Sequence, residues 1–342
     1  MTMQTMEPIF RKAKSMACRW TMIALMLATG IAAPAYAQTG WKPSHPVMFI
    51  VPNAAGGTSD RAARMLQRIM QTHKLIDVPI VIANRPGGNG TLALTQLHTH
   101  PGDGHVVMIM NSIIMSAHIA GLTPYSHADF TPLALLVDEY YGIHVRADSP
   151  LRTATELLAR LRKTPDALTF GSASPTGDNY ISMLTALKKS GIDVKRVKTV
   201  SFSGGSEIAL ALLGGHVDVT HSGLGNVLPH VREGRMRVLA ISGPRRLWGP
   251  FADVPTWKEV GVDTTASGWR GLLGPKGLPQ PQIAYWEDVL SKVVQTPEWK
   301  QDLEENFWVN AYTSAAEARR RLDREYAEIK QVMSELGIAK MK

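Results

Sequence analysis

The chain has 342 residues, a single cysteine and a formal net charge of +8, and 44% of its residues are hydrophobic. The basic residues are spread along the chain without the aromatic and basic interleaving of nucleic-acid-binding modules, which argues against a nucleic-acid partner. A mild positive charge instead favours small acidic ligands that arrive by diffusion. The length is typical of two domains or one large domain.

The N-terminal segment has the three parts of a secretory signal peptide. Four basic residues come first: Arg11, Lys12, Lys14 and Arg19. The apolar run over 21–33 follows and is too short to span a bilayer, and Ala35 and Ala37 form an Ala-x-Ala cleavage site. We expect residues 1–37 to be removed, which leaves about 305 residues and a net charge near +5. The only cysteine, Cys18, lies in this leader, so we expect a soluble periplasmic protein without disulfides.

From residue 47 onward, short β-rich runs alternate with helical patterns. The sequence predicts strands over 47–51, 78–82, 105–110, 168–171, 197–202, 217–220, 237–242 and 307–312. It predicts helices over 60–74, 91–99, 151–162, 180–189, 206–213, 281–305 and 314–336, with mostly loop from 244 to 281. This alternation indicates an α/β fold with a mostly parallel sheet covered on both faces. Ligands of such folds bind beyond the carboxyl ends of the strands, so the strand-to-helix loops are the candidate sites.

Loop one, defined here as residues 51–60, joins the first strand to the first helix. Gly56 and Gly57 let the backbone come close to a ligand. The helix N-terminus behind them attracts anions through its free N–H groups and its dipole. Thr58, Ser59 and Asp60 can also cap this helix, so an ordinary capped turn is the alternative interpretation.

Loop two, residues 84–91, is the next strand-to-helix connection. It adds a guanidinium at Arg85, three glycines and a second helix N-terminus. Two such ends converging on one cleft could hold a carboxylate directly or through water. Two further polar loops, 171–180 and 201–206, are rich in hydroxyls and glycine and suit the far end of a polar ligand, or are capped helix starts in solvent.

Motifs for catalysis or cofactor binding are weak in this chain. Residues 88–93 match the G-x-G-x-x-A dinucleotide pattern, but the next strand ends at Asn111 and Ser112 without the acidic residue that such a site needs. The sequence has no G-x-S-x-G elbow and no G-x-x-x-x-G-K-[ST] loop, and its histidines lack the spacing of a helical metal pair. We therefore expect no catalytic residue, no cofactor and no metal, and a periplasmic hydrolase is disfavoured.

An ordered set of short motifs resembles the receptors of tripartite tricarboxylate transporters, the Bug family of periplasmic binding proteins. These motifs are Val51-Pro with Gly56-Gly57 and Asp60, Asn84-Arg-Pro-Gly, Pro101-Gly-Asp-Gly104, Asp129-Phe-Thr-Pro132, Leu212-Leu-Gly-Gly-His-Val-Asp218 and Val254-Pro-Thr256. The resemblance covers essentially all of the chain after the leader.

The resemblance implies a two-lobed periplasmic-binding-protein fold of the Venus flytrap kind, type II-like, with two crossover strands. Lobe one would be discontinuous, comprising 38–138 and 244–342, and lobe two would comprise 139–243. The crossovers would lie near 141–145 and 237–241.

The resemblance also implies which residues bind the ligand. Loop one would contribute Asn53, Ala54, Gly57, Thr58 and Asp60, beside Gly56, and loop two would contribute Arg85, Pro86 and Gly87. Together they would form a pincer on one carboxylate, often through ordered waters. The distal part of the ligand would be held by Ser172, Thr176, Asp178, Asn179, Ser203, Gly204 and Asn226.

Two departures from the family pattern leave the ligand open. Asn53 stands where many members have an aromatic residue, and Thr176-Gly-Asp-Asn-Tyr180 replaces a hydroxyl-rich run. We expect a small tricarboxylate such as citrate, or a dicarboxylate, delivered by a monomeric receptor to the large and small membrane permease subunits of the transporter. The alternative is a periplasmic sensor that presents its carboxylate to a histidine kinase.

Overall fold

The computed structural model describes residues 40–172, 174, 176–202 and 205–340, so the expected leader over 1–37 lies outside the described residues. Within that part, ten strands form one mixed sheet with the order β2-β1-β3-β9-β4-β7-β5-β6, and β8 and β10 both pair with β4. No helix of the described part is long and apolar enough to cross a membrane.

The first half of the sheet is built on three parallel strands, β1 (Val47–Val51), β2 (Ile80–Asn84) and β3 (Val106–Asn111). One core cluster lies under α2 (Thr58–Thr72), α9 (Gln280–Val293) and α10 (Pro297–Asn306). A second cluster lies under α3 (Thr91–His98), α4 (Ile113–Ile119) and α11 (Ala315–Glu335). Loop one leads into α2 and loop two leads into α3, so the two loops start from neighbouring strands.

The second half repeats this arrangement. The strands β5 (Thr169–Ser172), β6 (Lys198–Ser201) and β7 (Val219–Gly223) are parallel. The main core cluster here packs under α5 (Ala154–Lys163) and α6 (Asp178–Lys189). Another cluster includes α7 (Gly205–Leu213) and Val227, just before α8 (Leu228–Arg232). Each half therefore has a main apolar core of its own, and two smaller clusters contain residues of both halves.

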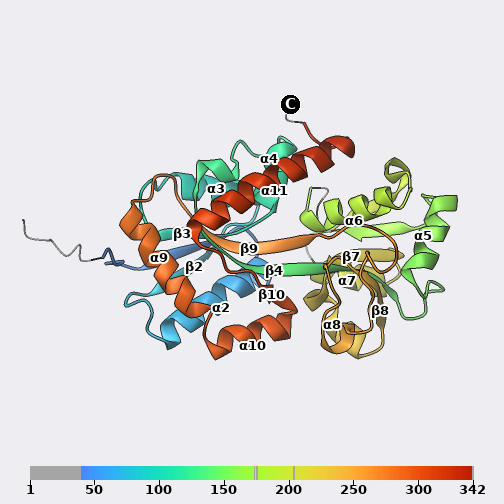
Figure 1. Cartoon of the computed structure of the whole chain (residues 1–342), viewed down its shortest axis with the longest axis horizontal. Helices are drawn as coiled ribbons and strands as arrows, with labels where there is room; N and C mark the ends of the chain where they lie inside the picture. The colour runs from blue at the N-terminus through green and yellow to red at the C-terminus, as the bar shows by residue number, and fades with distance from the viewer. Residues whose placement is uncertain (1–39, 173, 175, 203–204, 341–342) are drawn as a thin grey trace, which may run out of the picture. The chain divides into compact units, whose positions relative to one another are not determined.

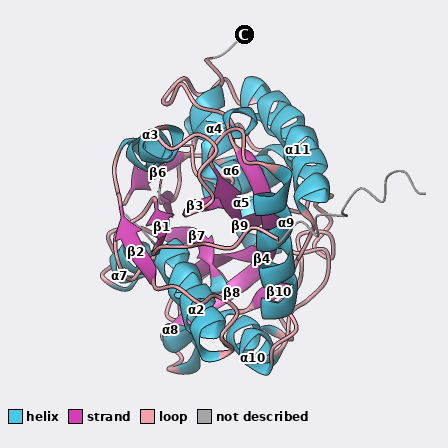
Figure 2. Ribbon diagram, turned by 90° about the vertical axis from the view of Figure 1, so that its left-hand side faces the viewer, coloured by secondary structure: helices cyan, strands magenta, loops and turns pink. Residues whose placement is uncertain are grey.

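The strand β4 (Thr131–Arg146) belongs to both halves (Figure 1). Its residues 131–140 pair with β9 (Ser267–Gly274), and its residues 141–146 pair with β7 and with β8 (Met236–Ile241). The short strand β10 (Trp308–Asn310) pairs with β4 on the first half. Figure 2 shows the strands in the interior, with helices on both sides of them. The first expected crossover, 141–145, is thus the end of β4, whereas 237–241 is β8 inside the second half, and the chain returns through 242–266.

Two predicted elements were wrong. The stretch predicted as mostly loop contains β9, which lies between β3 and β4 in the sheet. The single helix predicted over 281–305 is two helices, because Pro297 follows a new N-cap at Thr296, whose hydroxyl accepts from the Trp299 N–H. The sheet is also mixed rather than mostly parallel, since all pairs made by β4 and β9 are antiparallel.

The glycines of β9, which led to the prediction of a loop, are required by close packing. A Cβ at Gly271 would lie 2.5 Å from the Ala134 carbonyl oxygen, and one at Gly268 would lie 1.8 Å from the Tyr141 hydroxyl. Neighbouring main chain and a buried ring therefore occupy the space that side chains would fill.

We predict that Gly271→Ala destabilises the chain by about 3 kcal/mol or more, because the obstacle is backbone and cannot rotate away. Urea unfolding of Gly271→Ala measures this loss. The control is Gly40→Ala, since nothing lies within 4 Å of a Cβ at that exposed position. Equal stability of the two variants would contradict the packing assigned to β9.

Candidate functional site

The N-terminus of α2 is open toward loop one. Its N-cap, Gly57, has φ −71° and ψ 170° and offers no side-chain cap. The residues expected to cap this helix serve other roles: the Thr58 hydroxyl accepts from Arg61, and the Asp60 carboxylate turns back to the Gly56 N–H at 2.9 Å. The first turn of α2 therefore keeps N–H groups available to an anion.

Asp60 joins loop one to loop two. Its Oδ2 accepts from the Gly56 N–H and from Arg64 Nε, both at 2.9 Å, and its Oδ1 accepts from Asn84 Nδ2 at 3.0 Å. Asn84 Nδ2 also donates to the Asn53 carbonyl at 2.9 Å. Burial raises the pKa of Asp60, but the hydrogen bonds from Arg64, Gly56 and Asn84 outweigh it and hold this pKa below its ordinary value.

Loop two turns sharply over four consecutive residues with positive φ: Gly87, Gly88, Asn89 and Gly90. The 3-10 turn η1 (Gly88–Gly90) leads directly into α3, whose N-cap Gly90 is left-handed and uncapped by any side chain. Arg85 is exposed, and its guanidinium donates to the Gln96 side chain and to the Asn84 carbonyl. These two hydrogen bonds brace the loop, while Pro86 and Gly87 lie exposed beside it.

The distal residues of the second half lie at the N-terminus of α6. Ser172 ends β5 and is 1% exposed, and its hydroxyl has no partner among the described residues. Asp178 opens α6, and its Oδ2 accepts from the Ser112 hydroxyl at 2.5 Å, across from the first half. Asn179 donates to the His221 carbonyl at 2.9 Å, and Thr176 is 7% exposed.

The other distal candidates are less informative. Asn226 ends the 3-10 turn η4 (Leu224–Asn226) beyond β7 and is half-buried. Ser203 and Gly204 lie outside the described residues. In loop one, Asn53 is half-buried and Ala54 is exposed.

A buried ion pair where β4 passes from one half to the other had no signal in the sequence. Arg270 Nη2 lies 2.9 Å from Glu139 Oε2, and their side chains are 10% and 5% exposed. Burial raises the pKa of Glu139, and the Arg270 charge only partly offsets this. A Cβ at Gly223 would lie 2.1 Å from Glu139 Oε1, so this carboxylate needs a glycine on β7. The pair spans β4 and β9, and no strand was predicted at β9.

Two fully buried histidines lie on facing strands of the second half. His144 Nε2 donates to the Ser222 carbonyl at 3.2 Å, whereas neither ring nitrogen of His221 has a partner in the described part of the chain. Burial lowers the pKa of His144 to about 4. Burial, with the nearby His144, lowers the pKa of His221 to about 3.

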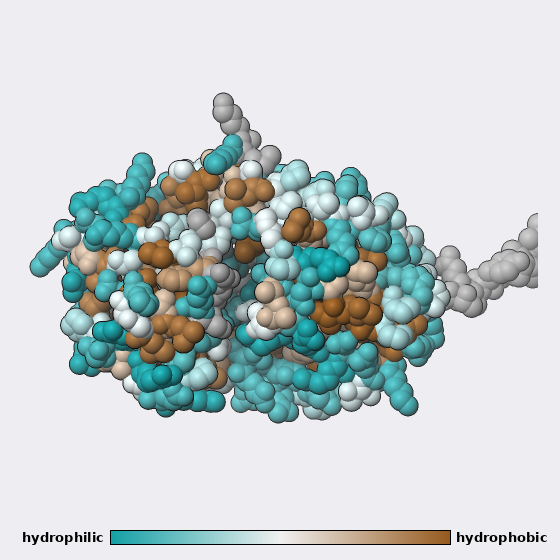
Figure 3. Space-filling view, turned by 180° about the vertical axis from the view of Figure 1, so that it is seen from behind, coloured by the Kyte–Doolittle hydropathy of each residue, from teal (hydrophilic) through white to brown (hydrophobic). Residues whose placement is uncertain are grey.

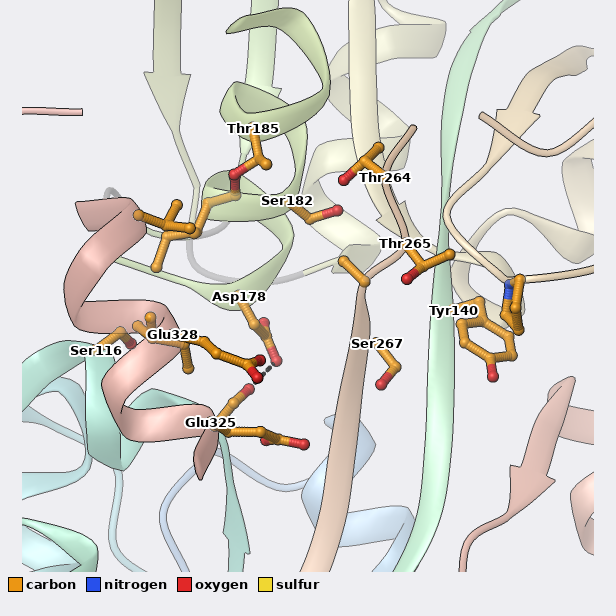
Figure 4. A pocket seen from close by; sticks show the side chains of 16 residues that line it. Ser116, Tyr140, Asp178, Ser182, Thr185, Thr264, Thr265, Ser267, Glu325 and Glu328 are labelled. Atoms are coloured by element: carbon orange, nitrogen blue, oxygen red, sulfur yellow. Dashed lines mark hydrogen bonds between the residues drawn. The ribbon is translucent and has the colours of Figure 1, made fainter. Parts of the chain in front are cut away.

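A cavity of about 350 Å³ lies between α6, α11 and the segment that leads into β9 (Figure 4). Among the described candidates for the carboxylate site, only Asp178 lines it. No group of His, Cys, Asp or Glu in the described part is arranged to hold a metal ion. Seen from behind, the surface is hollowed near its centre, and its hydrophobic side chains lie in separate areas rather than in one patch (Figure 3).

Comparison with protein families identifies the chain. The model of the tripartite tricarboxylate transporter family receptor matches residues 62–338. The chain belongs to this family. Its family and its structural neighbours are solute-binding receptors. The chain is likewise a periplasmic solute-binding receptor and not an enzyme.

Relatives of similar length support this assignment. The UPF0065 protein in gbd 5'region of Cupriavidus necator is 27% identical over 92% of this chain and 94% of its own. Protein BugT of Bordetella pertussis is 28% identical over 80% of this chain and 84% of its own.

Solved structures share the two-lobed binding-protein fold. MatC from Rhodopseudomonas palustris, solved with bound malate, is 26% identical with a TM-score of 0.72, over 85% of this chain and 99% of its own. Rpa4515 of R. palustris, solved with adipate, is 24% identical with a TM-score of 0.79, over 87% and 99%. The expected fold class and the expected family are therefore confirmed.

The two buried histidines predict how stability depends on pH. The unfolded chain takes up protons on them near pH 6.5, whereas the folded chain does so only near pH 4 and pH 3. Their contribution is therefore fully present above about pH 6.5 and is lost as the pH falls, by up to ~1.4 kcal/mol per pH unit for each histidine.

Urea unfolding of the native chain and of His221→Gln between pH 7 and pH 4.5 measures this dependence. We expect the variant to lose stability less steeply with acidification than the native chain. The same slope in both would show that His221 is not buried in its neutral form.

Proposed function

We propose that this receptor holds one carboxylate of a small di- or tricarboxylate between loop one and loop two. The observation that carries the proposal is the open N-terminus of α2, which is held beside the start of loop two by the Asp60 and Asn84 hydrogen bonds. An α-helix N-terminus with free N–H groups binds carboxylates through its dipole and its donors. The malate and adipate bound to two structural neighbours are ligands of this chemical class.

The binding set that we propose is the one expected from the sequence. Asn53, Ala54, Gly56, Gly57, Thr58 and Asp60 contribute from loop one, and Arg85, Pro86 and Gly87 from loop two. The distal end of the ligand is held by Ser172, Thr176, Asp178, Asn179, Ser203, Gly204 and Asn226. The buried Ser172 hydroxyl without a partner supports a polar distal end.

We further propose that lobe one comprises 38–138 and 244–342 and lobe two comprises 139–243, with β4 and the return through 242–266 as the connections. The main apolar clusters around β1–β3 and around β5–β7 support two lobes, and Trp257, Val262 and Leu336 of the proposed lobe one pack against the second of them. A ligand that contacts both lobes favours the closed arrangement, which the monomeric receptor then presents to the membrane permease subunits. Residues 1–37 direct the chain to the periplasm and are then removed.

Gly57→Val is predicted to weaken malate or citrate binding at least about tenfold, because its side chain covers the N–H groups of the first α2 turn. The φ of −71° suits any residue, but a Cβ would lie 3.3 Å from the Ala54 backbone oxygen, so loop one must shift slightly to accept the side chain. Titration calorimetry gives the affinity, and thermal unfolding gives the stability.

Arg85→Ala is the matched comparison within loop two. Since Arg85 donates to Gln96 and Asn84, we expect it to brace the loop and its loss to weaken binding only about threefold.

Full affinity in Gly57→Val would place the carboxylate elsewhere and overturn the proposed site.

A further inference from the structure

The cavity beside α11 has a chemistry opposite to that of the proposed carboxylate site. Three carboxylates line it, from Asp178 on α6 and from Glu325 and Glu328 on α11 (Figure 4). No Lys, Arg or His side chain is among its lining residues in the described chain. An anion placed there would face carboxylates and no lining cation, since Arg321, which pairs with Glu325, is not among the lining residues, so the cavity does not suit a second carboxylate.

Two hydroxyls in the cavity wall, on largely buried residues, have no hydrogen-bond partner in the described chain. The Ser182 and Thr264 residues are 6% and 7% exposed, and neither side chain makes a hydrogen bond within the described chain. Figure 4 shows both hydroxyls pointing into the cavity. Because both oxygens open into the cavity and no protein group occupies them, they are available to a bound molecule that carries hydrogen-bond donors.

The three carboxylates differ in how many hydrogen bonds and ion pairs they make with the rest of the protein. Glu325 accepts from Trp269 Nε1 and pairs with Arg321, both at 2.6 Å. Asp178 accepts from Ser112. Glu328 is exposed and makes no hydrogen bond or ion pair within the described chain, so no protein partner neutralises its charge, which solvent and salt screen.

We propose that this cavity is a second binding site, which takes a small organic ammonium group. Its volume of about 350 Å³ is that of a small-molecule site. An ammonium offers three N–H donors to carboxylate and hydroxyl oxygens, which are the groups that line the wall. A bare metal ion fits less well, because these carboxylates do not gather into a metal-binding group.

The ammonium has two possible sources: an independent amine, or the amino end of a ligand whose carboxylate lies between loops one and two. Asp178 lines the cavity and also belongs to the proposed distal site. A single ligand could therefore extend from loops one and two to the cavity. The cavity itself does not depend on the carboxylate proposal, because its charge and its unpartnered hydroxyls are properties of α6, α11 and residues 264–267.

Titration calorimetry at low ionic strength with putrescine, and with neutral 1,4-butanediol as the control ligand, tests the site. We expect putrescine to bind and butanediol not to bind. Glu328→Lys should weaken putrescine about tenfold, and Ser182→Ala about fivefold. The matched control is Glu304→Lys, an exposed carboxylate on α10 away from the cavity, which should leave the affinity unchanged.

Gly57→Val and the ligand 4-aminobutanoate separate the two sources. An independent amine site keeps its putrescine affinity in Gly57→Val. A shared ligand requires 4-aminobutanoate to bind, and requires both Gly57→Val and Glu328→Lys to weaken its binding.

The proposal is overturned if neither amine binds, or if Glu328→Lys and Glu304→Lys change the affinity equally. Malate binding, measured on the same variants, reports separately on loops one and two.

Discussion

The Asp60 carboxylate is the contact on which the proposed binding geometry depends. A carboxylate in the first turn of α2 would repel an anionic ligand if its charge were free. Here it accepts hydrogen bonds from the main chain of loop one, from Arg64 one turn further along α2, and from Asn84 at the end of β2. One side chain therefore fixes the two loops relative to each other, and its donors compensate its own charge.

A second buried carboxylate with its charge compensated lies where β4 passes from one half of the sheet to the other. Glu139 and Arg270 are both buried, and a buried ion pair adds little net stability because desolvation of the charges opposes their attraction. Removing one partner is costly, however, since the other charge would remain buried alone. The pair, with Asp178 and Ser112 beside it, makes this region polar, and ligand-dependent closure would act across it.

The sequence predicted the parts of this architecture that follow from local pattern. β1 was predicted at its observed residues, and α2, α5 and α11 within three residues, because their buried residues recur with the period of a strand or a helix. β9 could not be predicted, because its glycines are required by contacts with Ala134 and Tyr141 that only the assembled sheet creates. The boundary between α9 and α10 did have a local signal in the sequence, the N-cap Thr296 followed by Pro297. It was overlooked because the helical periodicity continues across it.

For the site, the sequence predicted which loops lie at the carboxyl ends of neighbouring strands, and the structure places loops one and two there. It could not predict the bracing role of Arg85, the inter-strand pair of Glu139 and Arg270, or the acidic cavity beside α11. Those features join residues more than a hundred positions apart or depend on the direction of a side chain, and neither property leaves a periodic pattern in the chain.

The central claim is that backbone N–H groups, rather than one cationic side chain, hold the carboxylate. Amide chemical shifts of the uniformly labelled receptor during titration with malate test it most directly. The account predicts that the largest changes fall on Thr58, Ser59 and the loop-two residues 87–90, with the Asn84 side-chain amide following them. Changes confined to other parts of the chain, with these amides unmoved at saturation, would contradict it.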